Sequence, residues 1–221
     1  MSTLPVTPRT RLVRRAERGS FDRAKIDAIL DEALICHIGF ALDGQPYVLP
    51  TVHVRIGTRL YVHGSVGSRM LRALCEGAQV CVTVTLLDGL VLARSAFHHS
   101  MNYRSVVVLG SAQEATDPEE KRRVFAALVE HIVAGRSREV RAPDDIETRA
   151  TTVLSLPIEE ASAKIRTGPP LDDERDHAQP CWAGVIPLEL AAGAPLADPG
   201  LTPGVALPQS LQPYRRARPL R

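Results

Sequence analysis

Alternating apolar and polar residues recur along the chain and predict a series of short strands. Runs with a period of two residues are bounded by turn formers such as Asp43-Gly44, Gly57-Thr58 and Asp88-Gly89. The strands predicted in this way span residues 35–40, 47–56, 59–63, 80–87, 90–94, 104–115, 151–158 and 182–188. Neighbouring strands joined by tight turns pair antiparallel, and this many strands in 221 residues tend to close into a barrel.

Helical periodicity occurs in three places between these strands. Favourable N-cap residues stand at Ser20 or Asp22, at Ser68 and at Asp117, and the third helix is expected to end at Gly135. The residues expected to face the core are Ile26, Ile29, Leu30 and Leu34 in the first helix, Met70, Leu71 and Leu74 in the second, and Val124, Leu128 and Ile132 in the third. A short helical turn is expected near residues 144–149. The predicted fold class is α+β, an antiparallel barrel with flanking helices.

Both ends of the chain differ from this middle part. Residues 1–20 contain two prolines and five arginines without apolar periodicity, and are expected to form an extended N-terminal arm. Residues 191–221 are rich in Pro, Gly and Ala and are expected to form a surface or disordered tail. One barrel domain over residues 21–190 lies between them.

Composition narrows the class of protein. The apolar fraction of 44% supports a core, and the net charge is only +2. The arginine-rich ends lack interleaved aromatic residues, which argues against nucleic-acid binding. No apolar run approaches the roughly 20 residues that span a bilayer, and no apolar stretch follows the basic start as in a secretion signal. We therefore expect a cytoplasmic protein without membrane association, whose four cysteines are reduced thiols.

The segment 97–105, Phe-His-His-Ser-Met-Asn-Tyr-Arg-Ser, is unusually polar for its place between two strand-like runs. It suits neither a simple hairpin loop nor a buried strand, and it predicts one wall of a polar ligand site. His98 and His99 are neighbours on an extended chain and would point to opposite faces, with no Asp, Glu or Cys partner at ligand spacing. A zinc site is therefore rejected.

Two other interpretations of the same segment stay open. A single histidine is enough to ligate haem iron. Alternatively, Asn102, Arg104 and Ser105 offer hydrogen-bond donors, and Tyr103 a stacking face, to a planar cofactor.

The stretch 63–69, His-Gly-Ser-Val-Gly-Ser-Arg, is a second candidate site. Two glycines allow close backbone approach, two hydroxyls follow, and Arg69 stands in the first turn of the predicted helix, an arrangement that attracts an anion such as phosphate. An ordinary strand–helix turn capped by serine explains the pattern equally well.

Pro50 marks a third candidate, because proline within a strand indicates an edge or a bulge. Thr51 and His53 would then face the same side. Strict alternation over residues 52–56 predicts that His53 and Arg55 lie opposite the buried face. An exposed edge strand with two polar residues is the favoured interpretation of this motif alone.

Two features near the C-terminal end have ordinary explanations. Lys164 and Arg166 precede a Gly-Pro-Pro turn at 168–170 that would hold them in place, although a solvated loop is the more usual explanation for such residues. Trp182, the single tryptophan, is interpreted as a core residue.

Together, and in this order, these motifs resemble the flavin-nucleotide-binding proteins of the pyridoxamine 5'-phosphate oxidase-like superfamily, and within it the nitroimidazole-resistance (Nim-type) branch. The matching segments are YVHGSVGSRMLRAL at 61–74, DGLVLARSAFHHSMNYRSVVVLG at 88–110, ATTVLSLPIEEASAKIRTGPPLDDERD at 150–176 and CWAGVIPL at 181–188. The resemblance covers roughly residues 10–190. It implies an antiparallel split β-barrel that forms a homodimer with FMN at the subunit interface.

The resemblance also implies roles for individual residues. Ser68 and Arg69 correspond to the positions that hold the FMN phosphate; many members have Lys where Arg69 stands, and arginine keeps the charge and adds bidentate geometry. The remaining correspondences are Pro50, Thr51, Val52 and His53 beside the isoalloxazine, His63, Gly64 and Ser65 near the ribityl chain, Asn102, Tyr103 and Arg104 as ring-side or partner-subunit contacts, and Trp182 closing the site.

The implied function is an FMN-dependent oxidoreductase that transfers hydride or electrons to a small, planar or nitroaromatic-like substrate. A cationic Arg104 or a protonated histidine near the ring would stabilise reduced flavin. No catalytic residue or metal is assigned, although His53 and then His98 rank first as proton donors. The alternatives are a non-catalytic flavin-binding protein and a haem-binding or haem-degrading split barrel.

Overall fold

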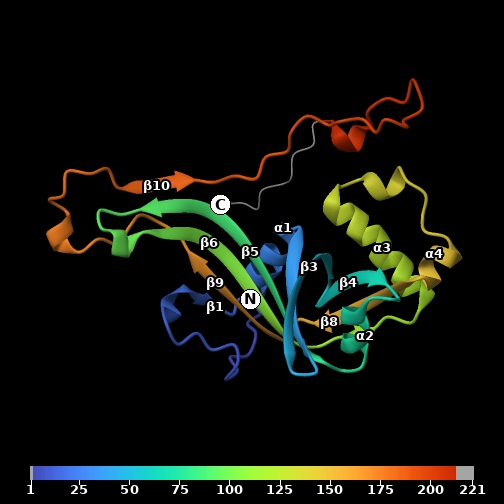
Figure 1. Cartoon of the computed structure of the whole chain (residues 1–221), viewed down its shortest axis with the longest axis horizontal. Helices are drawn as coiled ribbons and strands as arrows, with labels where there is room; N and C mark the ends of the chain where they lie inside the picture. Colours follow the sequence, from blue (N-terminus) through green and yellow to red (C-terminus); the bar gives the residue numbers. More distant parts are fainter. Residues whose placement is uncertain (1, 213–221) are drawn as a thin grey trace.

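The computed structural model describes residues 2–212 and shows a large antiparallel sheet with helices on its flanks (Figure 1). The strands are β1 (Gly19–Ser20), β2 (Ile35–Leu42), β3 (Gln45–Ile56), β4 (Arg59–Ser65), β5 (Gln79–Leu92), β6 (Ser100–Ser111), β7 (Gln113–Glu114), β8 (Thr151–Pro157), β9 (Glu160–Arg166) and β10 (Gly184–Pro187). The helices are α1 (Arg23–Glu32), α2 (Arg69–Cys75), α3 (Pro118–Ile132) and α4 (Asp145–Arg149), and the 3-10 turns are η1 (Ala16–Arg18), η2 (Ala96–His98), η3 (Arg136–Arg138), η4 (Glu174–Asp176) and η5 (Gln209–Leu211).

The strand order is β1-β9-β6-β5-β2-β3-β4-β8-β7, with β10 added to β5. All of these pairings are antiparallel. The predicted α+β class and split-barrel architecture are confirmed, and the sheet is not closed. The sheet instead curves around the main core (Figure 1).

The helices begin where the caps predict. The side chains of Asp22, Ser68 and Asp117 accept backbone N–H groups at the starts of α1, α2 and α3. Val124 in α3 is buried as expected, but the prediction for Ile132 is wrong, because its side chain is 45% exposed. His131 has the inward position in that turn, with its Nε2 2.8 Å from the carbonyl oxygen of Ala33.

Strand β5 corrects the prediction of a turn at Asp88-Gly89. The strand runs through both residues, and its register against β6 shifts between Leu87 and Gly89, as in a β-bulge. Beyond the bulge β5 pairs with β10 as well as β6. A bulge and a tight turn both favour glycine. The sequence alone therefore suggests a turn where the structure has a bulge.

Strand β9 is a second correction, since Lys164 and Arg166 belong to a strand rather than a loop. This strand lies between β6 and β1. Its inward residues Ala161 and Ala163 are fully buried. Alanines give a weak apolar signal, so the alternation with Ser162 and Lys164 was missed.

Strand β6 begins at Ser100, four residues earlier than predicted. The polar segment 97–105 is therefore a hairpin tip only up to residue 99 and a paired strand beyond it.

Two apolar cores hold the fold together. The main core lies between the curved sheet, α1 and α2, and the smaller one lies between α3 and strands β3, β4 and β8. Nine apolar side chains near the centre of the main core leave a void of only about 10 Å³. A flavin ring cannot lie inside this barrel.

All four cysteines are free thiols, and burial raises the pKa of Cys36 to about 12. Beyond β10 the described part of the tail is extended and mostly exposed, and Ser210 donates a hydrogen bond to Glu139 at 2.6 Å. The rest of the predicted tail, 213–221, lies outside the described residues. Within residues 2–212, no helix has the length and apolar character needed to cross a membrane.

Candidate functional site

Strand β3 changes partner near its middle, and this change creates a free edge. Residues 45–52 pair with β2, whereas residues 53–56 pair with β4. The edge position predicted for Pro50 is therefore confirmed. Backbone groups on the unpaired side of residues 45–52 have no strand partner within the described chain, and they can meet a ligand or another subunit.

The loop from β4 into α2 carries two hydroxyls and a cation that forms no ion pair within residues 2–212. Ser65 Oγ accepts a hydrogen bond from the N–H of Gly67 at 3.2 Å, and Ser68 Oγ accepts one from Leu71 at 3.4 Å. Each hydroxyl therefore keeps its own proton for an outside acceptor. Arg69 is exposed and forms no ion pair with any residue in 2–212. These donors suit an anionic group.

Arg69 also connects this loop to the free half of β3. Its guanidinium carbon lies 4.9 Å from the centre of the Tyr47 ring, a cation–π arrangement. The structure thus brings the second candidate stretch next to the half of β3 that also carries Pro50 and Thr51. Tyr47 was not predicted as a site residue, because only the pairing of strands far apart in sequence reveals the contact.

His63 and Gly64 lie at the end of β4, directly before this loop. Nδ1 of His63 is buried without a hydrogen-bond partner among the described residues, and burial lowers the pKa of this imidazole. His63 is therefore neutral near pH 7. A Cβ atom at Gly64 would lie 3.0 Å from Leu71 Cδ1, so glycine permits α2 to pack closely on β4.

His53 is not on an outward face, and this part of the prediction is wrong. The side chain is fully buried, and its Nε2 lies 3.0 Å from the carbonyl oxygen of Leu30 in α1. Val54 and its apolar neighbours pack against α3, while His53 lies beneath α1. Both faces of this half-strand are covered, and a buried His53 does not suit an outward proton donor.

Strand β2 contributes an accessible histidine that the sequence interpretation left out. His37 is exposed and pairs with Pro50 on one side and Thr83 on the other. Cys36 and Ile38, which alternate with it, are buried. The alternation of apolar and polar residues along β2 is the feature of the sequence that could have identified His37. It places His37 on the outer face beside the free edge.

Asn102 is buried and binds the chain just after β9. Its Nδ2 donates to the carbonyl oxygen of Gly168 at 3.1 Å, and its Oδ1 accepts from Arg166. Arg166 also donates to the carbonyl oxygens of Gly168 and Pro169. The two side chains hold the Gly-Pro-Pro turn in place, and Arg166 is buried rather than solvated. For Asn102, this role differs from a direct contact with a flavin ring.

Arg104 is bound by two carboxylates of its own chain. Its guanidinium forms ion pairs with Asp88 of β5 and Glu32 of α1. The hydrogen bonds to Asp88 and then Glu32 hold the pKa of Arg104 far above its ordinary value. Arg104 therefore joins α1 to the sheet, and its charge is already balanced without a flavin. Tyr103, which lies between Asn102 and Arg104 in the sequence, is half-buried, and its backbone pairs with that of Arg166.

Trp182 is not a core residue, because its side chain is 66% exposed. Its ring lies against Gly184, where an added Cβ would come within 2.8 Å of it. Closing of the site by Trp182 stays a prediction.

Comparison with known proteins identifies the family of this chain. The model of the family described as pyridoxamine 5'-phosphate oxidase matches residues 22–165. The chain belongs to this family. The match covers the sheet from α1 to β9 and includes the loop that carries Arg69. No curated protein sequence matches the chain.

Solved structures of this family extend the likeness to nearly the whole chain. The flavocytochrome Anf3 from Azotobacter vinelandii is 41% identical, with a TM-score of 0.89 over 96% of this chain and 98% of that one. An FAD- and haem-binding protein from Mycobacterium smegmatis is 39% identical, with a TM-score of 0.85 over 88% and 96%. A Bacteroides thetaiotaomicron protein assigned to 5-nitroimidazole antibiotic resistance is 26% identical, with a TM-score of 0.55 over 65% and 84%. The predicted family is confirmed.

Proposed function

We propose that this chain is a flavin-dependent redox protein whose flavin is held between the two subunits of a homodimer. The observation that carries the proposal is the donor set at the start of α2. There, Ser65 and Ser68 have hydroxyl protons to donate, and the Arg69 guanidinium lacks a carboxylate partner among residues 2–212. This set fits the phosphate of a flavin nucleotide.

The rest of the flavin is expected along the free edge of β3. Pro50 and Thr51 lie there, and the packed barrel interior excludes an internal site. A bound flavin supplies hydride and single-electron transfer. The chain binds the phosphate, orients the ring against the strand edge and excludes water through the second subunit. His63 at the strand end is neutral, so it would not add positive charge.

Haem as a second redox group is the other candidate function. It is favoured by the near full-length similarity to a flavocytochrome and to a protein described as binding FAD and haem. In that case electrons would pass between flavin and haem. FAD then replaces FMN as the expected flavin, because the Mycobacterium smegmatis relative is described with FAD. A nitroaromatic acceptor has the weaker support of a relative at 26% identity.

The visible spectrum of the purified protein tests these proposals. Flavin bands are expected, a Soret band if haem is bound, and the mass of the flavin released by denaturation distinguishes FAD from FMN. Anaerobic NADPH should bleach the flavin faster than free flavin. Bleaching no faster than that of free flavin would indicate a non-catalytic binding protein, and no uptake of either flavin would overturn the proposal.

A matched pair of variants tests the phosphate site. Arg69→Ala should weaken flavin binding by at least about tenfold, the loss of one charge-assisted hydrogen bond worth about 1.5–3 kcal/mol. Arg72→Ala removes an exposed arginine one turn further along α2 and should leave flavin binding unchanged. Equal affinities in the two variants would place the phosphate elsewhere.

A further inference from the structure

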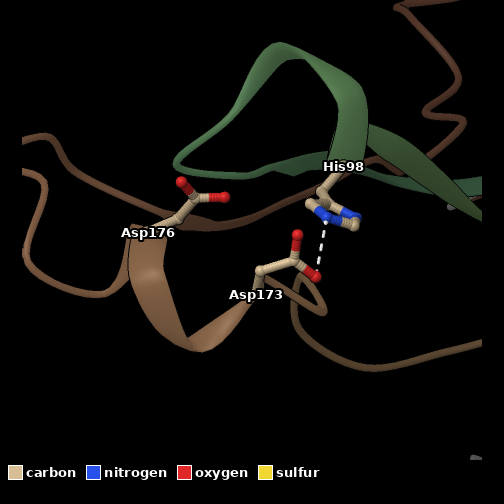
Figure 2. A group of neighbouring side chains, drawn as sticks. All are labelled: His98, Asp173 and Asp176. Carbon is tan, nitrogen blue, oxygen red and sulfur yellow. Dashed lines mark ion pairs between the residues drawn. The ribbon is translucent and has the colours of Figure 1, made fainter.

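The tip of the β5–β6 hairpin meets a distant loop in a cluster of three potential metal ligands. Figure 2 shows His98 of η2 facing Asp173 and Asp176, which lie at the two ends of the short turn η4. One ligand atom from each residue lies within 4.8 Å of the other two. The structure thus supplies carboxylate partners that the sequence spacing did not reveal, because 75 or more residues separate them from His98.

The two aspartates come together through local geometry. They are three residues apart, and side chains at this spacing point in the same direction in a 3-10 turn. Asp173 is the N-cap of the turn and Asp176 is its last residue. His98 completes the group from the opposite segment, so the arrangement offers one nitrogen and two oxygen ligands.

The charges in this cluster are incompletely balanced. Asp173 has His98 Nε2 at 3.4 Å and the exposed Arg175 at 3.6 Å. The carboxylate of Asp176 forms no hydrogen bond or ion pair with any residue in 2–212. The two carboxylates lie close enough for their like charges to repel each other. A divalent cation between them would reverse this repulsion.

Contacts outside the cluster hold its two segments in place. Asp172, whose side chain is 1% exposed, accepts hydrogen bonds from the backbone N–H of Arg94 at 2.9 Å and from its guanidinium at 2.8 Å. This pair attaches the η4 segment to the end of β5. On the hairpin, His99 Nδ1 lies 2.9 Å from the carbonyl oxygen of Ser95. The three ligand groups are therefore positioned before any ion binds, which lowers the entropic cost of binding.

We propose that His98, Asp173 and Asp176 bind a divalent first-row transition-metal ion, with water in the remaining positions. A mixed imidazole and carboxylate set suits Zn²⁺, Co²⁺ or Mn²⁺ better than Ca²⁺ or Mg²⁺, which prefer oxygen ligands alone. The site lies at the far end of the β5–β6 hairpin, away from α2 and the proposed phosphate loop (Figure 1). Its role would be to fasten the η4 loop to the hairpin.

Cobalt titration of the full-length protein tests this site, because Co²⁺ bound to nitrogen and oxygen ligands absorbs visible light. The protein is first treated with a chelator that leaves flavin and haem in place, and difference spectra remove their contribution. One equivalent of Co²⁺ should bind saturably, with Zn²⁺ displacing it and raising the melting temperature. His98→Ala and Asp176→Asn should each weaken binding by about tenfold or more.

Two neighbouring residues provide matched controls. His99→Ala removes the adjacent histidine, and Glu174→Gln removes an exposed carboxylate from the same turn. Both should bind Co²⁺ like the unmodified chain. The proposal is overturned if no saturable binding occurs, or if all four variants bind equally. A change in the haem spectrum of His98→Ala, with cobalt binding unaffected, would assign His98 to haem instead and also overturn it.

Discussion

At the scale of single residues, Arg104 connects carboxylates from two different elements. Its side chain is 25% exposed, and it lies between Glu32 and Asp88. In Arg104→Met the two carboxylates lose their shared cation and face each other in a partly buried position. We expect the free energy of unfolding to fall by about 2 kcal/mol, less than for a fully buried pair because solvent screens the charges.

Chemical denaturation measures this effect. Arg72→Met provides the control, because Arg72 is exposed on α2 and its side chain has no hydrogen bond with the described residues. Its substitution should change stability by no more than about 0.5 kcal/mol. Similar losses in both variants would show that the ion-pair network contributes nothing beyond the loss of a surface arginine.

His63 gives the fold a pH dependence with a defined sign. Burial lowers its pKa below the ordinary value of 6.5, so the unfolded chain takes up a proton at a higher pH than the folded chain. Protonation then favours unfolding, and stability should fall as the pH drops from above 6.5 toward the pKa of the folded state. His63→Gln should flatten this part of the curve. Unfolding measured by denaturant at several pH values tests the slope, and an unchanged slope would contradict the assignment.

At the scale of elements, Gly89 determines how β10 joins the sheet. An added Cβ would lie 3.1 Å from the carbonyl oxygen of Ile186 and 3.1 Å from Val185 Cγ1, so β10 would have to shift. Gly89→Ala should therefore speed hydrogen exchange in residues 184–186 while β6 stays protected. Gly193→Ala is the control, because nothing lies within 4 Å of its added Cβ. Equal exchange in both variants would mean that β10 adapts without loss of pairing.

The sequence predicts those elements that depend on local signals. Caps such as Asp22 and Ser68 act within one helical turn, and Asp43-Gly44 joins two neighbouring strands, so all three are confirmed. The errors occur where partners are distant. Asp88-Gly89 resembles a turn until β10 is known to pair there, and β9 pairs with β6, more than 50 residues earlier in the chain.

In the candidate site too, the sequence predicts local features but not those that depend on distant parts of the chain. The proposed phosphate loop at 65–69 is continuous in sequence, so its two hydroxyls and Arg69 belong to one short segment, and phosphate binding there stays a prediction. The burial of His53 was not foreseeable, because a period of two residues distinguishes two faces of a strand but not what covers each face. The ion pairs of Arg104 were not foreseeable either, because its carboxylate partners come from α1 and from β5.

At the scale of the whole molecule, part of the outer face of β2 and β3 is not covered by any segment within residues 2–212. Val48 pairs with Gly39, and Ile35 pairs with Val52, so these residues share the outer face of β2 and β3. Val48 is 65% exposed and Ile35 is 44% exposed. Exposed apolar side chains beside a free strand edge are typical of a protein–protein interface. We expect the partner subunit of the proposed homodimer to cover this face.

Val48→Asp tests this expectation, because a carboxylate buried at the interface without a partner is strongly unfavourable. Light scattering after size exclusion should show a monomer, or a dimer weakened by at least about tenfold in its dissociation constant. Ile146→Asp is the matched control: Ile146 is 71% exposed, but it lies on α4, away from the free half of β3 (Figure 1). A dimer that survives Val48→Asp would place the interface on another surface.

Flavin content in the same samples links assembly to cofactor binding. If the flavin lies between subunits, Val48→Asp should lose flavin at protein concentrations where it is monomeric, although Ser65, Ser68 and Arg69 are intact. Raising the protein concentration should restore both the dimer and the flavin, since the two equilibria are linked. Arg69→Ala should instead lose flavin while remaining a dimer. A monomeric Val48→Asp protein with full flavin content would show that one chain alone holds the cofactor.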